Sequence, residues 1–273
     1  MEVGISPPSA GRSLFVFVAL ALLLSWVPAL LLSFPGGVRF VHLDRLAGTP
    51  SFWIVAVAPL LAVAIARLVA KDSSPCGFSM DLPVRWIAVA LVLPGLWVAG
   101  VIILGESARL SAWPYPRETG LSAAGLSLRT TAAVGLPLAL VQEAAWRGYL
   151  LPRLLARGRI EASLIVGLIW AACTLPWLYL IWPYGEAHPV LGTAAHILQI
   201  ILLSLLMTWL YTRSRRSLIV CVLAHAMLWT FAGTITGPGH LDGMPILVGA
   251  RGILGSMFLV LWAWLVYLRG GLR

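Results

Sequence analysis

Apolar residues run along this chain in blocks of about 20, separated by short polar connections. A helix rises about 1.5 Å per residue, so about 20 apolar residues span the roughly 30 Å hydrocarbon core of a bilayer. The pattern predicts an all-α fold, a polytopic membrane protein with about eight transmembrane helices. The predicted helices are 13–34, 51–70, 86–104, 130–152, 161–183, 192–212, 217–236 and 246–268.

Composition favours a membrane protein over a soluble one. Of the 273 residues, 60% are hydrophobic and 11% are charged, whereas soluble domains carry about 25% charged residues. The first apolar run is too long for the core of a signal peptide and is interpreted as a membrane helix. Three parts are expected: 1–129 with three helices and an external loop, 130–236 as the core, and 237–273 with the last helix.

The net charge of +9 comes almost entirely from arginine. A basic chain suits either nucleic acid or the excess of Lys and Arg in cytoplasmic loops. These cations lie between apolar runs, so a lipid bilayer is the expected partner and nucleic acid is not. With the N-terminus inside, the inner connections hold twelve Lys and Arg residues and the outer ones six. Both termini are therefore predicted to be cytoplasmic.

Two ionisable residues in the fourth predicted helix stand out. Glu143 and Arg147 are four residues apart, so they share one face of a helix and can pair. An ionisable side chain deep in a bilayer costs roughly 3 kcal/mol by insertion scales, which makes a functional role a reasonable hypothesis. The pair can serve as a structural clasp or hold a carboxylate for chemistry. Spacing alone favours the clasp.

Other polar residues fall at comparable depths in two further helices. Glu143 and His225 each lie about 12 Å from the inner ends of their helices, and Thr174 about 5 Å deeper. A site shared by these three helices is therefore geometrically allowed. His196 lies about 25 Å from its inner end and is expected outside that site. The remaining histidines are placed in outer loops: His42, His188 and His240.

Several catalytic signatures are missing from the sequence. There is no His-Glu-x-x-His motif, no Gly-x-Ser-x-Gly elbow and no Walker loop. The three cysteines, Cys76, Cys173 and Cys221, form no Cys-x-x-Cys pair. No cofactor and no metal site are expected.

The stretch from Gln142 to Trp229 resembles the CPBP family of CAAX-protease-like and bacteriocin-processing (Abi) membrane proteins. That family shows Glu-Glu-x-x-x-Arg, an aromatic-x-x-x-His and His-x-x-x-Asn on three membrane helices. The matching stretches here are Gln142-Glu143-Ala144-Ala145-Trp146-Arg147, Trp170-Ala171-Ala172-Cys173-Thr174 and His225-Ala226-Met227-Leu228-Trp229. The resemblance implies an eight-helix intramembrane endopeptidase scaffold in a bacterial cytoplasmic membrane, and it leaves the role of a metal open.

The departures fall on the chemistry that the resemblance implies. In the family the first Glu and the first His activate water, while the second His and the Asn stabilise the oxyanion. These positions hold Gln142, Thr174 and Trp229 here, whereas Glu143, Arg147 and His225 keep the family residues. Gln cannot act as a general base, and Thr cannot shuttle protons as imidazole does. Losing one oxyanion donor alone costs about a hundredfold or more.

Three hypotheses follow for the function. The favoured one is a weakened or inactive protease that binds a membrane-protein partner or peptide. The second is an active endopeptidase with altered chemistry, in which Glu143 is the base and His225 the acid or oxyanion donor. The third is a small transporter that uses the polar cavity. A nucleophilic Cys173 or Cys221 with His225 is a minor alternative.

Overall fold

The computed structural model describes residues 8–33, 50–108, 129, 131–181, 189–235 and 252–272, and within these it contains helices and no strand. Each of the eight predicted apolar segments is largely helical over the residues that are described, while 34, 130, 182–183, 236 and 246–251 lie outside them. The elements are α1 Pro8–Ser33, α3 Pro50–Ala70, α4 Val84–Ser107, η1 Thr131–Gly135, α6 Leu136–Glu143, η2 Ala144–Leu150, α7 Leu151–Leu154, η3 Leu155–Arg157, α8 Arg159–Ile181, α10 Pro189–Arg213, α11 Leu218–Ile235 and α13 Ile253–Leu268.

Four stretches within these helices are long and apolar enough to cross a membrane. They are Gly11–Leu31, Val84–Gly105, Arg159–Pro176 and Pro189–Arg213. Shorter apolar helices accompany them. The all-α membrane architecture is therefore confirmed, whereas the count of eight spans stays a prediction.

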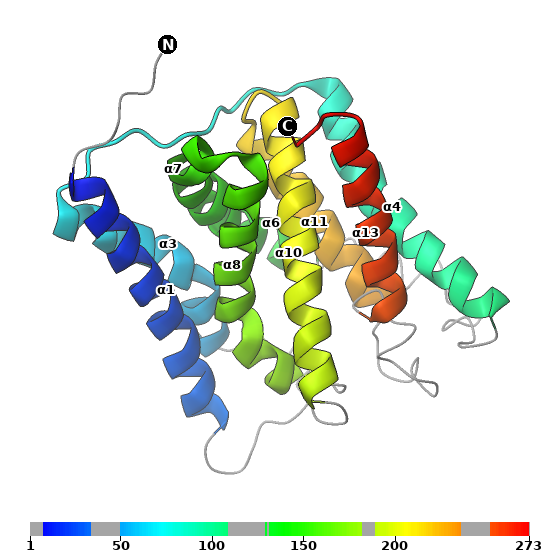
Figure 1. The fold of residues 1–273 in the computed structure, drawn as a ribbon. Coiled ribbons are helices and arrows are strands. Elements are labelled where there is room, and N and C mark those ends of the chain that lie inside the picture. The colour runs from blue at the N-terminus through cyan, green and yellow to red at the C-terminus, as the bar shows by residue number, and fades with distance from the viewer. Residues whose placement is uncertain are drawn as a thin grey trace.

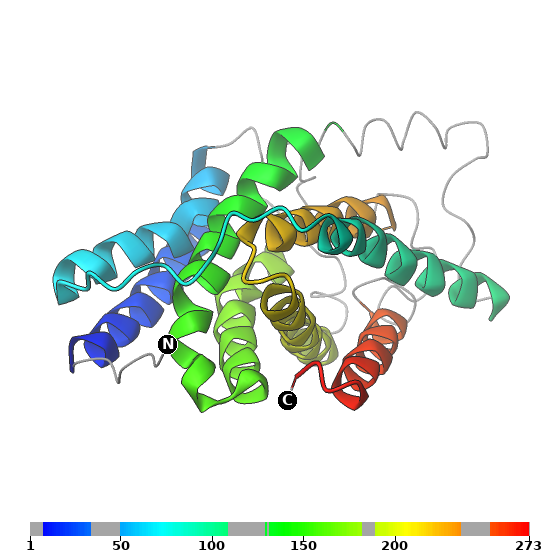
Figure 2. The same ribbon diagram turned by 90° about the horizontal axis from the view of Figure 1, so that it is seen from above.

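Helices α8 and α10 run antiparallel through the middle of the bundle (Figure 1). Helices α1 and α3 pack together on one side of α8, and α13 packs against α10 on the other; Figure 2 shows the same order from above. Helices α8 and α10 approach closely at Gly167, where an added Cβ would lie 2.8 Å from the Cα of Ile201 and 3.1 Å from the Cβ of Ser204. This glycine fixes the register between the two helices.

A strap, residues 71–83, crosses one end of the bundle between α3 and α4 (Figure 1). The Gly77 N–H donates to the Gly148 carbonyl at 3.0 Å, and the Ser79 N–H donates to the Arg216 carbonyl at 2.8 Å. The Tyr211 hydroxyl donates to the Gly77 carbonyl. The strap thus connects η2 with the turn between α10 and α11. Its backbone groups lie outside any helix, and those of Gly77 and Ser79 are paired through these contacts.

One carboxylate anchors the strap to two helices. Asp72 Oδ2 accepts hydrogen bonds from Ser13 Oγ at 3.1 Å and Arg153 Nη2 at 2.8 Å, while Oδ1 accepts from the Ser74 N–H at 2.9 Å. Burial raises the pKa of Asp72, but the hydrogen bonds from Ser74 and Arg153 lower it by a larger amount. The net pKa therefore lies well below the usual value. Asp72 is therefore ionised, and its carboxylate links the strap to α1 and α7 through hydrogen bonds.

The basic connections gather at one end of the bundle. The start of α1, the strap, the α7–α8 junction, the α10–α11 turn and the end of α13 all lie at the upper end in Figure 1. These segments include the ones predicted to face the cytoplasm. The cytoplasmic orientation of that end and the division into three parts stay predictions.

Candidate functional site

The helix that carries Glu143 changes its winding directly after this residue. Helix α6 ends at Glu143, and the next seven residues, 144–150, form the π-helix η2. Short π-helical turns occur frequently at functional sites because they re-aim side chains. At Gly148 an added Cβ would lie 2.9 Å from the ring of Phe78, so the strap packs directly against this turn.

Three ionisable side chains meet inside the bundle. Glu143 Oε1 lies 3.1 Å from Arg147 Nη1 and 2.6 Å from His225 Nδ1. The side chains of Glu143 and Arg147 are fully buried, and His225 is 4% exposed. The pair of Glu143 and Arg147, which their four-residue spacing allows, is observed. The contact of Glu143 with His225, which their equal depth allows, is observed as well. We call Glu143, Arg147 and His225 the acid cluster.

An indole closes one side of the acid cluster. The Arg147 guanidinium lies 4.9 Å from the centre of the Trp170 ring, a cation–π distance, and the rings of Trp170 and His225 are 5.2 Å apart. Trp170 was not predicted as a site residue. The signal was present nevertheless, since Trp170 is the aromatic residue of the second motif.

Several polar atoms of the acid cluster make no hydrogen bond with the part of the chain that is described. They are Glu143 Oε2, Arg147 Nε and Nη2, and the neighbouring Trp146 Nε1. Most buried polar atoms in proteins are paired, because an unpaired one costs about 1–3 kcal/mol. One acceptor and several donors of neighbouring residues therefore keep hydrogen-bonding capacity that the described residues do not use.

The contact through Nδ1 gives the imidazole a defined chemical role. If the proton of the neutral ring sits on Nδ1 and is donated to Glu143, then Nε2 is the acceptor. A carboxylate on one ring nitrogen and a reacting group on the other is the arrangement in which the acid orients the base. The geometry thus suits Glu143 as the orienting group and His225 Nε2 as the proton acceptor, the reverse of the roles expected from the sequence.

The three substituted motif positions differ in their surroundings. Gln142 is half-buried and adjoins Glu143 on α6. The Thr174 hydroxyl lies 3.0 Å from the Trp170 carbonyl and 2.9 Å from His196 Nε2. Trp229 belongs to α11, but its side chain lies outside the described residues. Of the three residues Glu143, Thr174 and His225, Glu143 and His225 are in direct contact. Thr174 contacts His196 instead and lies one helical turn beyond Trp170 on α8.

The expectation that His196 lies away from the level of Glu143 stays a prediction, whereas its contact with Thr174 was not predicted. His196 is 2% exposed and contacts Thr174. The close packing at Gly167 sets the register: Thr174 is seven residues beyond Gly167 on α8, and His196 lies five residues before Ile201 on the antiparallel α10. Depth counted from predicted helix ends gave no information on this register.

The remaining candidates include two buried cysteines. Cys173 and Cys221 are both buried in the hydrophobic core. Cys221 lies one turn before His225 on α11 and is close enough to Glu143 and Arg147 to interact electrostatically with both. His42, His188 and His240 lie outside the described residues. Across the described ranges, no three His, Cys, Asp or Glu side chains are grouped so that they could hold a metal ion. The expectation that the protein has no cofactor stays a prediction.

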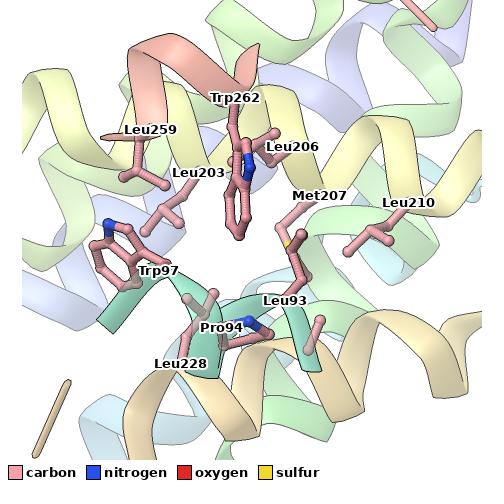
Figure 3. A pocket seen from close by; sticks show the side chains of 11 residues that line it. Leu93, Pro94, Trp97, Leu203, Leu206, Met207, Leu210, Leu228, Leu259 and Trp262 are labelled. Atoms are coloured by element: carbon pink, nitrogen blue, oxygen red, sulfur yellow. The ribbon is translucent and has the colours of Figure 1, made fainter. Parts of the chain in front are cut away.

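A separate cavity lies between α4, α10, α11 and α13 (Figure 3). Its volume is only about 20 Å³, and it is bordered by apolar side chains, the indoles of Trp97 and Trp262 among them. Ala224, next to His225 in the chain, also borders it. Its lining holds no charged group, and the space is about that of one water molecule, so the cavity is a packing gap rather than a ligand site.

A comparison with known protein families matches residues 124–232 to the family described as Type II CAAX prenyl endopeptidase Rce1-like. The matched range contains the whole acid cluster, Trp170, Thr174 and His196. No curated protein matches the chain at a significant level. The resemblance carried by the three motifs is therefore confirmed.

Proposed function

From the premise that residues 124–232 belong to the Rce1-like family of type II CAAX prenyl endopeptidases, we propose that this membrane protein binds a peptide segment of a membrane partner at the acid cluster and has lost hydrolysis by the family mechanism. The observation that carries the proposal is the set of buried polar atoms on Glu143 and Arg147 that have no partner among the described residues. An extended peptide offers N–H and C=O groups that complement them.

Loss of hydrolysis is supported by the chemistry of the substituted positions. Gln142 stands where the family has its first Glu, and an amide does not take up a proton at neutral pH. Thr174 stands where the family has its first His, and its hydroxyl is engaged with the Trp170 carbonyl and His196. Neither residue supplies the general base that activates water in the family.

Ligand binding is supported by the free-energy cost of burying the charged side chains of the acid cluster. Removing a buried ion pair in favour of apolar residues is often neutral or stabilising by about 1–4 kcal/mol, so stability alone gives little reason to keep one in lipid. Binding of a peptide would satisfy Glu143 Oε2 and Arg147 Nη2. Because both side chains are fully buried, the helices must part first, and we expect association slower than about 10⁵ M⁻¹s⁻¹.

A second candidate, an endopeptidase with altered chemistry, is favoured by one contact. The 2.6 Å distance from His225 Nδ1 to Glu143 Oε1 suits an oriented imidazole base, with Nε2 available to activate water. In this case His225 would replace the missing base at position 142. No described contact favours a transporter.

The test uses the full chain in proteoliposomes and a farnesylated peptide ending in Cys followed by three residues, with a fluorophore on the last residue. The binding proposal predicts saturable peptide binding, a loss of affinity of roughly tenfold or more in Glu143→Gln, and no release of fluorophore. Release that disappears in His225→Ala would instead establish the altered endopeptidase. Absence of binding by the native chain would overturn the proposal.

A restored variant separates lost chemistry from a damaged scaffold. Gln142→Glu, Thr174→His and Trp229→Asn together return the family residues to the three motifs. If the scaffold is intact, this variant releases fluorophore at a rate at least a hundredfold above that of the native chain. The control is the same triple variant with His225→Ala, which should release none.

A further inference from the structure

The turn between α10 and α11 holds two arginines in an unusual backbone conformation. Three non-glycine residues of the described chain have a positive φ, and all three are cations: Lys71 at 51°, Arg215 at 58° and Arg216 at 63°. This left-handed region is unfavourable for residues that carry a Cβ, whereas glycine adopts it freely. Two adjacent arginines at positions that favour glycine indicate that their side chains have a role.

The strap holds this turn through the backbone of the arginines. The Arg215 carbonyl accepts from the Ser79 hydroxyl at 2.9 Å, and the Arg216 carbonyl accepts from the Ser79 N–H at 2.8 Å. The Leu218 N–H donates in return to the Ser79 carbonyl at 2.9 Å. Because these bonds use no arginine side chain, glycine could occupy the turn equally well, and the fold of the turn does not explain the two arginines.

The two guanidinium groups are available at the surface. Arg215 and Arg216 are exposed, and neither side chain forms a hydrogen bond or an ion pair with the described part of the chain. Arg213, two residues earlier, differs from them because its Nη2 lies 3.4 Å from the Gly270 carbonyl. The donors of Arg215 and Arg216 can therefore bind a partner outside the protein.

Exposed apolar side chains adjoin the turn on the strap and at the start of α4, at the upper end of the bundle in Figure 1. They stand at every second position, and each is 60% exposed or more: Met80, Leu82 and Val84. Arg85 follows them, with its guanidinium 5.5 Å from the centre of the Trp86 ring. The exposed Asp81 lies among them, so with Arg215 and Arg216 the region holds three cations and one acid. We call residues 79–85 and 215–216 the cationic surface.

We propose that the cationic surface binds the headgroup of an anionic phospholipid, with the guanidinium groups of Arg215 and Arg216 on the phosphate and the exposed apolar side chains in the adjoining acyl region. Guanidinium groups recognise phosphate oxygens through paired hydrogen bonds. Segments that combine apolar side chains with Lys and Arg bind anionic membranes through both terms. A soluble phosphate would use the arginines alone. This surface is separate from the acid cluster, and its binding does not depend on peptide.

The experiment measures the unfolding temperature of the full chain in micelles of a neutral detergent, with either phosphatidylglycerol or phosphatidylcholine at the same mole fraction. A lipid that binds the folded state raises this temperature, so the native chain should unfold roughly 3–8 °C higher with phosphatidylglycerol. Arg215→Gly with Arg216→Gly removes both guanidinium groups and relieves the left-handed conformation. It should unfold within about 2 °C of the native chain in phosphatidylcholine and lose most of the gain. Arg215→Gln with Arg216→Gln should lose the same gain.

The control removes the same charge at the same end of the bundle. Arg157→Gln with Arg269→Gln replaces two exposed arginines that lack a positive φ, and this variant should keep the gain. Equal gains for the native chain and the glycine variant would overturn the proposal. A control that loses as much as the glycine variant would overturn it too, since net charge would then explain the effect. So would a native chain that gains nothing from phosphatidylglycerol, or gains as much from water-soluble glycerol phosphate.

Discussion

Two buried acid–arginine pairs in this molecule have different hydrogen-bonding environments. In the strap anchor, Asp72 and Arg153 are 2.8 Å apart, and both carboxylate oxygens have partners. In the acid cluster, Glu143 and Arg147 are 3.1 Å apart, but Oε2 of Glu143 and two nitrogens of Arg147 have none among the described residues. On Arg153, only Nε lacks a partner in the same part of the chain.

This difference separates a structural pair from a candidate binding pair. A satisfied network holds its elements together and has no remaining capacity for a ligand, whereas an incompletely satisfied one carries a cost that a ligand can offset. The two pairs also differ in setting. Arg153 is 12% exposed, whereas Arg147 is fully buried. The comparison predicts that Asp72 matters for stability alone and Glu143 for both stability and binding.

The largest expected effect follows from breaking the acid cluster on one side. Arg147→Leu leaves the Glu143 carboxylate buried without its cation, and we expect a loss of about 3–5 kcal/mol in the free energy of unfolding. Glu143→Leu with Arg147→Leu removes both charges and should recover most of that loss. Chemical denaturation in micelles measures both. A double variant as unstable as Arg147→Leu would show that the charges do not act as a pair.

A smaller effect is expected at the strap anchor. Asp72→Asn keeps the shape of the side chain but removes the charge that faces Arg153, and we expect a loss of about 1–3 kcal/mol in the free energy of unfolding. The affinity for the farnesylated peptide should not change. A loss of affinity at unchanged fold would mean that the strap, and not the acid cluster alone, takes part in binding.

Acid should act on the strap anchor in a defined pH window. The pKa of Asp72 in the folded protein is lowered from 3.8, so the unfolded state binds the proton first. Its contribution to stability is therefore complete above about pH 5 and is lost as the pH falls through 3.8 and toward the lower folded value. The difference in unfolding temperature between the native chain and Asp72→Asn should begin to shrink as the pH falls below 3.8 and should keep shrinking down to pH 2. Parallel curves down to pH 2 would contradict this.

The smallest effect is expected at an exposed pair with the same spacing as Glu143 and Arg147. Arg157 and Glu161 are 3.3 Å apart, four residues from each other, and 60% and 55% exposed. Water screens this pair, so Glu161→Ala should cost about 0.5 kcal/mol or less. The variant serves as the matched control for Glu143, and a cost equal to that of Arg147→Leu would show that burial is not the cause of the larger effect.

The sequence predicted the parts of the fold that follow from one helix at a time. Long apolar blocks located the helices, and the spacing of Glu143 and Arg147 located their pair, since both depend only on the rise and the turn of a helix. The strap was not predicted, because residues 71–83 carry no apolar period and their partners are backbone groups distant in sequence. The π-helical winding after Glu143 also left no signal in the apolar pattern.

Contacts between helices were predictable only in part. The equal depth of Glu143 and His225, estimated from the sequence, indicated that the two side chains could meet, and they do. The contact of Thr174 with His196 depends on the register of α8 against α10, which is set by one close approach at Gly167. The residue pattern does not indicate which glycine of a membrane helix will meet a neighbouring backbone, so the contact of Thr174 with His196 was not predicted.

The most direct test of the central claim is the equilibrium affinity of the farnesylated peptide for Glu143→Gln and for Asp72→Asn, measured on full-length protein in proteoliposomes with the folded fraction determined for each. We predict that Glu143→Gln weakens binding by roughly tenfold or more and that Asp72→Asn leaves it unchanged. Equal affinities for the two variants would contradict the assignment of the acid cluster as the binding site.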